Sequence, residues 1–110
     1  MIEKIVLDYL NANLNVTAHA EKPDKPPLRY VLIEKTGGSE ENCINNATIV
    51  IQSYAESLAE ASKLNEEVKK VMKKIITLNN IGKSKLNTDY NYTDTTKKVY
   101  RYQAVFDLTY

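Results

Sequence analysis

The sequence predicts an α+β fold over residues 1–110, with a mainly antiparallel sheet and about two helices packed on one face. Three observations favour it. Apolar residues recur at helical spacing in two segments, residues 2–11 and 54–76. Apolar and polar residues alternate from Val99 to Tyr110, as in a strand with one buried face. The order helix, strands, helix, strands is typical of an antiparallel sheet with helices on one side.

Length and composition are those of one folded domain. The chain has 110 residues, of which 43% are hydrophobic and 26% are charged. A net charge of +1 supplies no strong field for steering toward nucleic acid, a membrane or an acidic substrate. No apolar run reaches the roughly 20 residues that cross a bilayer, and the first residues lack the pattern of a signal peptide. We therefore expect a soluble protein that is cytoplasmic when made and has no membrane partner.

The first half of the chain predicts a helix and then two strands. The opening residues MIEKIVLDYLN form an amphipathic helix, and residues 16–20 can extend before three prolines break regular structure. Arg29 to Lys35 is rich in β-forming residues and lies between these prolines and Gly37-Gly38, which predicts a short strand. Residues 37–46 are predicted as a turn or long loop. Ala47 to Tyr54 then predicts a second strand, antiparallel to the first.

The second half predicts a long helix and then strands. Residues 54–76 carry one apolar stripe, and their acids come early and their bases late, which complements the helix dipole. Residues 83–97 are polar, and we expect a short strand at Tyr90 and Tyr92 and a turn near Asp94. In the final strand, residues 100, 102, 104, 106, 108 and 110 share one apolar face. At a sheet edge, so long a strand would provide a route to self-assembly.

The sequence predicts no catalytic residue, no metal and no cofactor. His19 has no carboxylate or cysteine at ligand spacing, and Cys43 lies alone in a polar stretch. Glu40 and Glu41 are neighbours in a predicted loop, where they keep the loop soluble rather than act as an acid and base pair. Gly37-Gly38 lacks the following lysine and helix start of a phosphate-binding loop, so a tight turn is favoured.

Lysines and tyrosines leave two alternatives open. The run KKVMKK, together with Tyr90, Tyr92, Tyr100 and Tyr102, would form a surface for single-stranded nucleic acid if they met in space. We disfavour this hypothesis, because the helix dipole accounts for the lysines and half of the tyrosines alternate as core residues. The tyrosines suit a protein interface or the rim of the core equally well.

With these elements in order, the chain resembles the tail terminator, or tail completion (minor tail), proteins of long-tailed bacteriophages and prophages. The resemblance covers almost the whole chain. It rests on the first helix and on three segments: the proline-bearing lead into RYVLIEKTGG, the passage ATIVIQSYAESLAEASKLNEEVKKVM, and the ending NYTDTTKKVYRYQAVFDLTY. A strand before a glycine turn, a Q-x-Y-A helix opening and a late R-Y-Q strand recur in this order in that family.

The resemblance implies a structural protein without enzymatic activity. Its subunits would form a homo-oligomeric ring, typically a hexamer, that ends polymerisation of the tail tube and presents a surface to the head connector. The partners would be copies of itself, the tail tube protein and neck proteins, in the virion at the head-proximal end of the tail, after assembly in the host cytoplasm. The alternatives are a head-to-tail connector or neck component, or a small nucleic-acid-binding domain.

Two sets of residues are the candidates for contact. The polar segments Thr36–Asn46 and Gly82–Lys98 are the expected loop faces. The resemblance carries Gln52, Tyr54 and Ala55 onto the helix opening and Arg101, Tyr102 and Gln103 onto the late motif. The individual candidates for subunit or tube contacts are Arg29, Lys35, Glu40, Glu41, Arg101 and Gln103.

Overall fold

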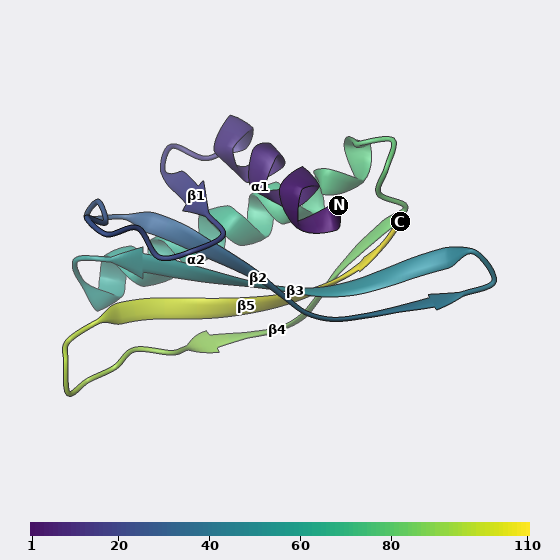
Figure 1. Cartoon of the computed structure of the whole chain (residues 1–110). Coiled ribbons are helices and arrows are strands. Elements are labelled where there is room, and N and C mark those ends of the chain that lie inside the picture. Colours follow the sequence, from purple (N-terminus) through teal and green to yellow (C-terminus); the bar gives the residue numbers. More distant parts are fainter.

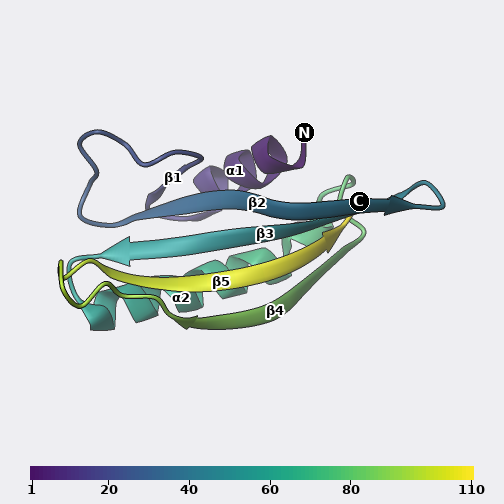
Figure 2. The same cartoon turned by 60° about the horizontal axis from the view of Figure 1, so that its bottom comes forward.

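Two helices lie on one face of a five-stranded sheet, as the computed structural model of residues 1–110 shows in Figure 1 and Figure 2. The predicted α+β class is therefore confirmed. In chain order, the elements are α1 (Ile2–Asn13), β1 (Thr17–His19), β2 (Tyr30–Glu41), β3 (Ile44–Ala55), α2 (Leu58–Lys73), a 3₁₀ turn (Ile75–Thr77), β4 (Lys83–Asn91) and β5 (Tyr100–Thr109).

The strands lie in the order β1-β2-β3-β5-β4, and every neighbouring pair is antiparallel except β1 and β2. The last strand, β5, is therefore not an edge strand, and the expectation that it pairs with another subunit is wrong. The reason is its burial. Ala104, Phe106 and Leu108 are almost fully buried, so this strand takes a central place beneath the helices, between β3 and β4.

The core lies between the helices and the sheet. Its apolar side chains alternate along β3 and β5 and recur at helical spacing on α1 and α2, as predicted. The Tyr9 hydroxyl of α1 donates to the Val71 carbonyl of α2 at 2.7 Å, which ties the two helices together. The main contributors are Ile2, Val6 and Leu10 of α1, Ile49 and Ile51 of β3, Leu64, Val68 and Met72 of α2, and Ala104, Phe106 and Leu108 of β5.

The long helix begins four residues later than predicted, at Leu58. Tyr54 and Ala55 belong to β3, where they pair with Arg101 and Tyr100, so the Q-x-Y-A segment ends a strand instead of opening a helix. The Ser57 side chain accepts a hydrogen bond from the Glu60 backbone N–H at 3.2 Å and caps the first turn. A cap of this kind contributes about 1 kcal/mol and fixes where the helix begins.

The predicted loop at residues 37–46 is instead a hairpin. β2 continues through both glycines to Glu41, and β3 begins at Ile44. The turn is Asn42-Cys43 alone, with positive φ at both residues (51° and 65°), as a type I′ turn requires. Gly38 is needed for close approach, because a Cβ there would lie 3.2 Å from the Asn46 carbonyl oxygen and 3.0 Å from the Lys35 side chain.

We call residues 36–46 the hairpin arm. Figure 1 shows it extending beyond the helices as a two-stranded ribbon. The polar segment 82–98, expected as a loop, is also largely a strand: β4 pairs along β5 from Lys83 to Asn91, with a bulge between Leu86 and Thr88. Polar residues suit this strand because it lies at the edge of the sheet and is mostly exposed to solvent.

Candidate functional site

The groups weighed for catalysis do not meet. His19 hydrogen bonds with Thr17 at 2.8 Å and meets the Tyr30 ring edge-on, while Cys43 is exposed in the turn of the hairpin arm. No three histidine, cysteine, aspartate or glutamate side chains are placed to hold a metal ion. Neither helix has the length and apolar character needed to pass through a bilayer.

The six candidate contact residues fall into two groups at opposite ends of β2. Arg29 lies just before the start of β2, and Arg101 and Gln103 lie across the same end of the sheet on β5. Lys35, Glu40 and Glu41 lie on the distal half of β2, and all three are exposed. The structure therefore brings the six residues to two separate surfaces.

Arg101 and Gln103 belong to a network on the open face, which is the face of the sheet turned away from the helices. Gln103 Oε1 accepts a hydrogen bond from Gln52 Nε2 at 2.8 Å, and its amide group also bonds Tyr90 Oη. The Arg101 guanidinium lies 4.5 Å from the Tyr92 ring centroid, and its Nε donates to the Tyr92 carbonyl at 2.7 Å. These contacts hold β3, β4 and β5 together, which is a scaffold role.

The same network includes residues that sequence reasoning did not connect. Tyr30 and Tyr54 stack with ring centroids 4.6 Å apart, and the Tyr54 hydroxyl donates to Gln52 Oε1 at 2.8 Å. Alternation places Gln52 and Tyr54 on one face of β3, but only the register of β3 with β2 and β5 shows that they meet Tyr30 and Gln103. No signal in a single sequence supplies that register.

Arg29 is held by an ion pair at the start of β2. Its Nε lies 3.0 Å from both carboxylate oxygens of Glu56, and Glu60 is 3.5 Å from another of its nitrogens. The hydrogen bond from Arg29 is the main cause that lowers the Glu56 pKa to about 2. The pair joins the start of β2 to the segment before α2, so Arg29 has a structural partner within its own subunit.

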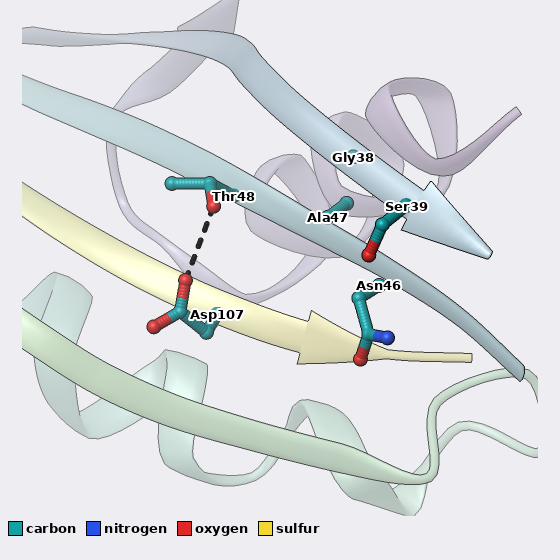
Figure 3. Close-up of a pocket in the computed structure, with 6 residues that line it drawn as sticks. All are labelled: Gly38, Ser39, Asn46, Ala47, Thr48 and Asp107. Atoms are coloured by element: carbon teal, nitrogen blue, oxygen red, sulfur yellow. Dashed lines mark hydrogen bonds between the residues drawn. The ribbon is translucent and has the colours of Figure 1, made fainter. Parts of the chain in front are cut away.

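A shallow polar hollow lies at the base of the hairpin arm on the open face. Figure 3 shows Ser39, Asn46, Thr48 and Asp107 around it. Thr48 Oγ1 donates to one Asp107 oxygen at 3.1 Å, and Asn87 donates to the other at 3.0 Å. Both carboxylate oxygens of Asp107 thus have partners within the subunit, and the hollow is open to solvent.

A basic groove lies between α2 and β4. Lys69 Nζ binds Asp89 at 3.1 Å and Glu66 at 3.0 Å, and these hydrogen bonds raise the Lys69 pKa. Lys70, Lys73 and Lys85 line the same groove without an ion pair. Its volume is about 630 Å³, and Leu86 and Phe106 provide its apolar part. The run KKVMKK predicted that lysines cluster on the helix. That they lie in one groove with Lys85 of β4 depends on how α2 packs against the sheet, which the sequence does not show.

The lysines and tyrosines do not form the single surface that the nucleic-acid hypothesis requires. Tyr90 lies on the open face opposite Gln103, whereas Tyr102 pairs with Ser53 on the face covered by the helices. The four tyrosines are thus divided between the two faces of the sheet.

Comparison with protein families and with curated proteins finds no match to this chain. Its function must therefore be inferred from the resemblance of its sequence and from the geometry of its surfaces.

Proposed function

We propose that this protein is a structural component of a long-tailed phage or prophage, which caps the tail tube as a ring, ends tube polymerisation and provides the surface for head attachment. The observation that supports this most is the hairpin arm. It extends from the domain, is almost entirely exposed, and carries the adjacent acids Glu40 and Glu41 just before its turn.

The arm adds little to the stability of its own subunit. None of its side chains belongs to the hydrophobic core. From Ser39 to Asn46 its two strands pair with each other, and only Asn45 and Asn46 also bond the end of the chain at Thr109 and Tyr110. A two-stranded ribbon without a buried face is only marginally stable in water. An exposed ribbon of this kind acquires its use, and further stabilisation, when it contacts another protein.

The mechanism is binding alone. Copies of the subunit close around an axis into a ring, a hexamer by the resemblance, and one annular face matches the last ring of the tail tube protein. Further tube subunits cannot then add, and the opposite face meets the head connector. The protein would act at the head-proximal end of the tail in the virion, after assembly in the bacterial cytoplasm, and would need no cofactor.

The test is the growth of tail tubes from purified tube protein with and without this protein. We expect shorter tubes of more uniform length, with this protein at one end only, measured by electron microscopy and co-sedimentation. A protein that neither binds tubes nor changes their length at any concentration contradicts the proposal. Binding to the head connector but not to tubes would instead identify a neck component.

A matched pair of variants tests the arm. The double variant Glu40→Lys and Glu41→Lys reverses two charges on the arm, and Glu21→Lys with Asp24→Lys makes the same charge change in an exposed loop at the other end of the sheet. We expect the arm variant to lose capping and the loop variant to retain it. Equal loss in both would assign the effect to net charge rather than to the arm.

A further inference from the structure

Besides the three-residue outer edge of β1, the sheet has two unpaired edges of equal length. β2 has 12 residues, of which three pair with β1, so nine residues, Ile33 to Glu41, have a free outer edge. The outer edge of β4 is free along all 9 of its residues, Lys83 to Asn91. Neither helix forms a ladder with these edges: α2 lies behind the sheet, and α1 lies behind β1 and β2, where it reaches past the outer edge of β2 in the view of Figure 2. Free strand edges present unpaired N–H and C=O groups to another chain.

The two edges have compatible directions. β2 is antiparallel to β3, β3 to β5, and β5 to β4, so β2 and β4 run in opposite directions. If β4 of one copy is placed beside the free edge of β2 in the next copy, the sheet continues as an antiparallel sheet. Such strand addition is a common mode of recognition between proteins.

Their charges are complementary when the two nine-residue edges overlap fully. Glu41 of one copy then lies opposite Lys83 of the next, and Lys35 opposite Asp89. Both pairs also share a face. Within the subunit, Lys35 lies opposite Ile49 of β3, and Asp89 lies opposite Ala104 of β5. Ile49 and Ala104 are both buried on the helix-covered face.

The other pair lies on the opposite face. Within the subunit, Glu41 lies opposite Ile44 of β3, and Lys83 lies opposite Thr109 of β5. By the alternation of these strands, both positions are on the open face. A shift by two residues in one direction leaves only Glu41 opposite Lys85, and a shift in the other direction leaves no opposite-charge pair. Full overlap is thus the register with the most opposite-charge pairs across the ladder, and such pairs are favourable whereas like charges are not. Glu41 with Lys83 is the main pair, because Asp89 also bonds Lys69 and Asn65 within its own subunit.

We propose that copies of this chain join head to tail by antiparallel pairing of β4 with the free edge of β2, in the register that places Glu41 opposite Lys83. This inference rests on the proposed ring-forming function and names the surfaces that would form the ring. The contact is heterologous, since each subunit uses a different edge toward each neighbour. It therefore ends only when the ring closes, and closure leaves neither of these two edges free.

The first test traps the register with cysteines. In a Cys43→Ser background, Glu41→Cys with Lys83→Cys places thiols at a cross-strand distance that suits a disulfide. Under mild oxidation, free or on tail tubes, we expect a ladder of linked subunits that ends at one closed species. The mismatched pair Glu41→Cys with Asn91→Cys should give at least about tenfold less product, because those positions lie at opposite ends of the ladder. Equal yields, or no product from the matched pair in either setting, overturns the proposal.

The second test uses charge exchange between copies. Glu41→Lys alone places lysine opposite lysine, and Lys83→Glu alone places glutamate opposite glutamate, so each variant should associate at least about tenfold more weakly than the native chain. In an equal mixture, every contact between the two variants joins opposite charges. We expect association to recover, with alternating composition by native mass spectrometry. Mixtures no better than the separate variants contradict the head-to-tail contact.

The two proposals fail in different ways. If the matched cysteines link subunits but the native protein does not stop tube growth, the edge pairing stands and the capping function is wrong. If the native protein caps tubes while the matched cysteines are not trapped on them, the function stands and the ring is built through other surfaces.

Discussion

Two polar side chains, Ser53 and Asn65, are buried among the apolar residues between the helices and the sheet. Asn65 Nδ2 donates to Asp89 at 2.9 Å and links α2 to β4, whereas its Oδ1 and the Ser53 hydroxyl have no partner. A buried polar atom without a hydrogen bond loses the interactions that it had with water. The two residues therefore differ, because Asn65 retains one useful bond and Ser53 retains none.

The Ser53→Ala variant should be as stable as the native chain or more stable by about 1 kcal/mol, because it removes a hydroxyl whose burial is uncompensated. Urea unfolding followed by circular dichroism measures the change. Thr48→Val is the matched control: it removes the hydroxyl that bonds Asp107 and should lower the free energy of unfolding by about 0.5–1.5 kcal/mol. A clear loss of stability in Ser53→Ala would mean that the hydroxyl has a partner.

The Arg29 and Glu56 ion pair makes stability depend on pH in the acid range. The folded-state pKa of Glu56 is about 2, below the value of 4.5 for a free glutamate. Its contribution is therefore fully present above pH 4.5 and is lost as pH falls toward 2. We expect Glu56→Gln to flatten the dependence of melting temperature on pH in that window, and added salt to reduce the difference from the native chain. An unchanged slope in Glu56→Gln would contradict this ion pair in solution.

The sequence predicted which polar residues are candidates for contact, but not which side chains they contact in the folded subunit. Arg101 and Gln103 were predicted as candidates on the polar face of the last strand, and the structure places them in hydrogen bonds within the subunit. A strand pattern states which face a side chain is on. It does not state which neighbour lies beside it, so the ladder between Gln52 and Gln103 and the pair of Arg29 with Glu56 could not be predicted.

At the scale of elements, the sequence predicted each main helix and strand but not the ends of several. The clearest difference is at Gly37-Gly38, predicted as a turn and found within β2. In sequence, a glycine that permits close approach beside a bulge cannot be distinguished from a glycine in a turn. The real turn, Asn42-Cys43, lacks the glycine that marks most type I′ turns, so nothing in the pattern identified it.

Cys43→Gly should stabilise the hairpin arm, because glycine adopts the positive φ of this position without the strain that a side chain adds. The arm stands apart from the core, so the effect should appear as slower hydrogen exchange of arm amides rather than as a large rise in global stability. Cys43→Val is the control, since a β-branched residue is poorly tolerated at positive φ, and it should speed exchange. The same exchange rates in both variants would contradict the turn.

At the scale of the molecule, the helices on one face and the mainly antiparallel sheet were predicted, whereas the order of the strands was not. The alternation in the last strand showed that one face is buried and gave no information on whether one or two strands flank it. Both β3 and β5 carry such alternation, and β4 hardly does. A polar strand can form at the edge because pairing with β5 satisfies one side of its backbone and water satisfies the other.

Phe106→Ala should lower the free energy of unfolding by about 3–5 kcal/mol, because the ring is only 2% exposed and its removal leaves a cavity under α2. That is a large part of the stability of a domain of this size. Leu86, its partner across the ladder, is 37% exposed, and Leu86→Ala should cost much less. Denaturant unfolding of both variants measures the difference. Similar losses in the two would contradict the central place of β5.

The central position of β5 also affects when the protein is ready to associate during synthesis. β3 and β4 meet only through β5, which is the last strand along the chain. Until that strand has been made, β4 has no partner in the sheet, and long-range pairing of this kind is slow to form. The β2 edge is already present in the β2–β3 hairpin, whereas β4 joins the sheet only through β5. A contact that needs both edges therefore cannot form between neighbouring nascent chains until β5 of each has been made.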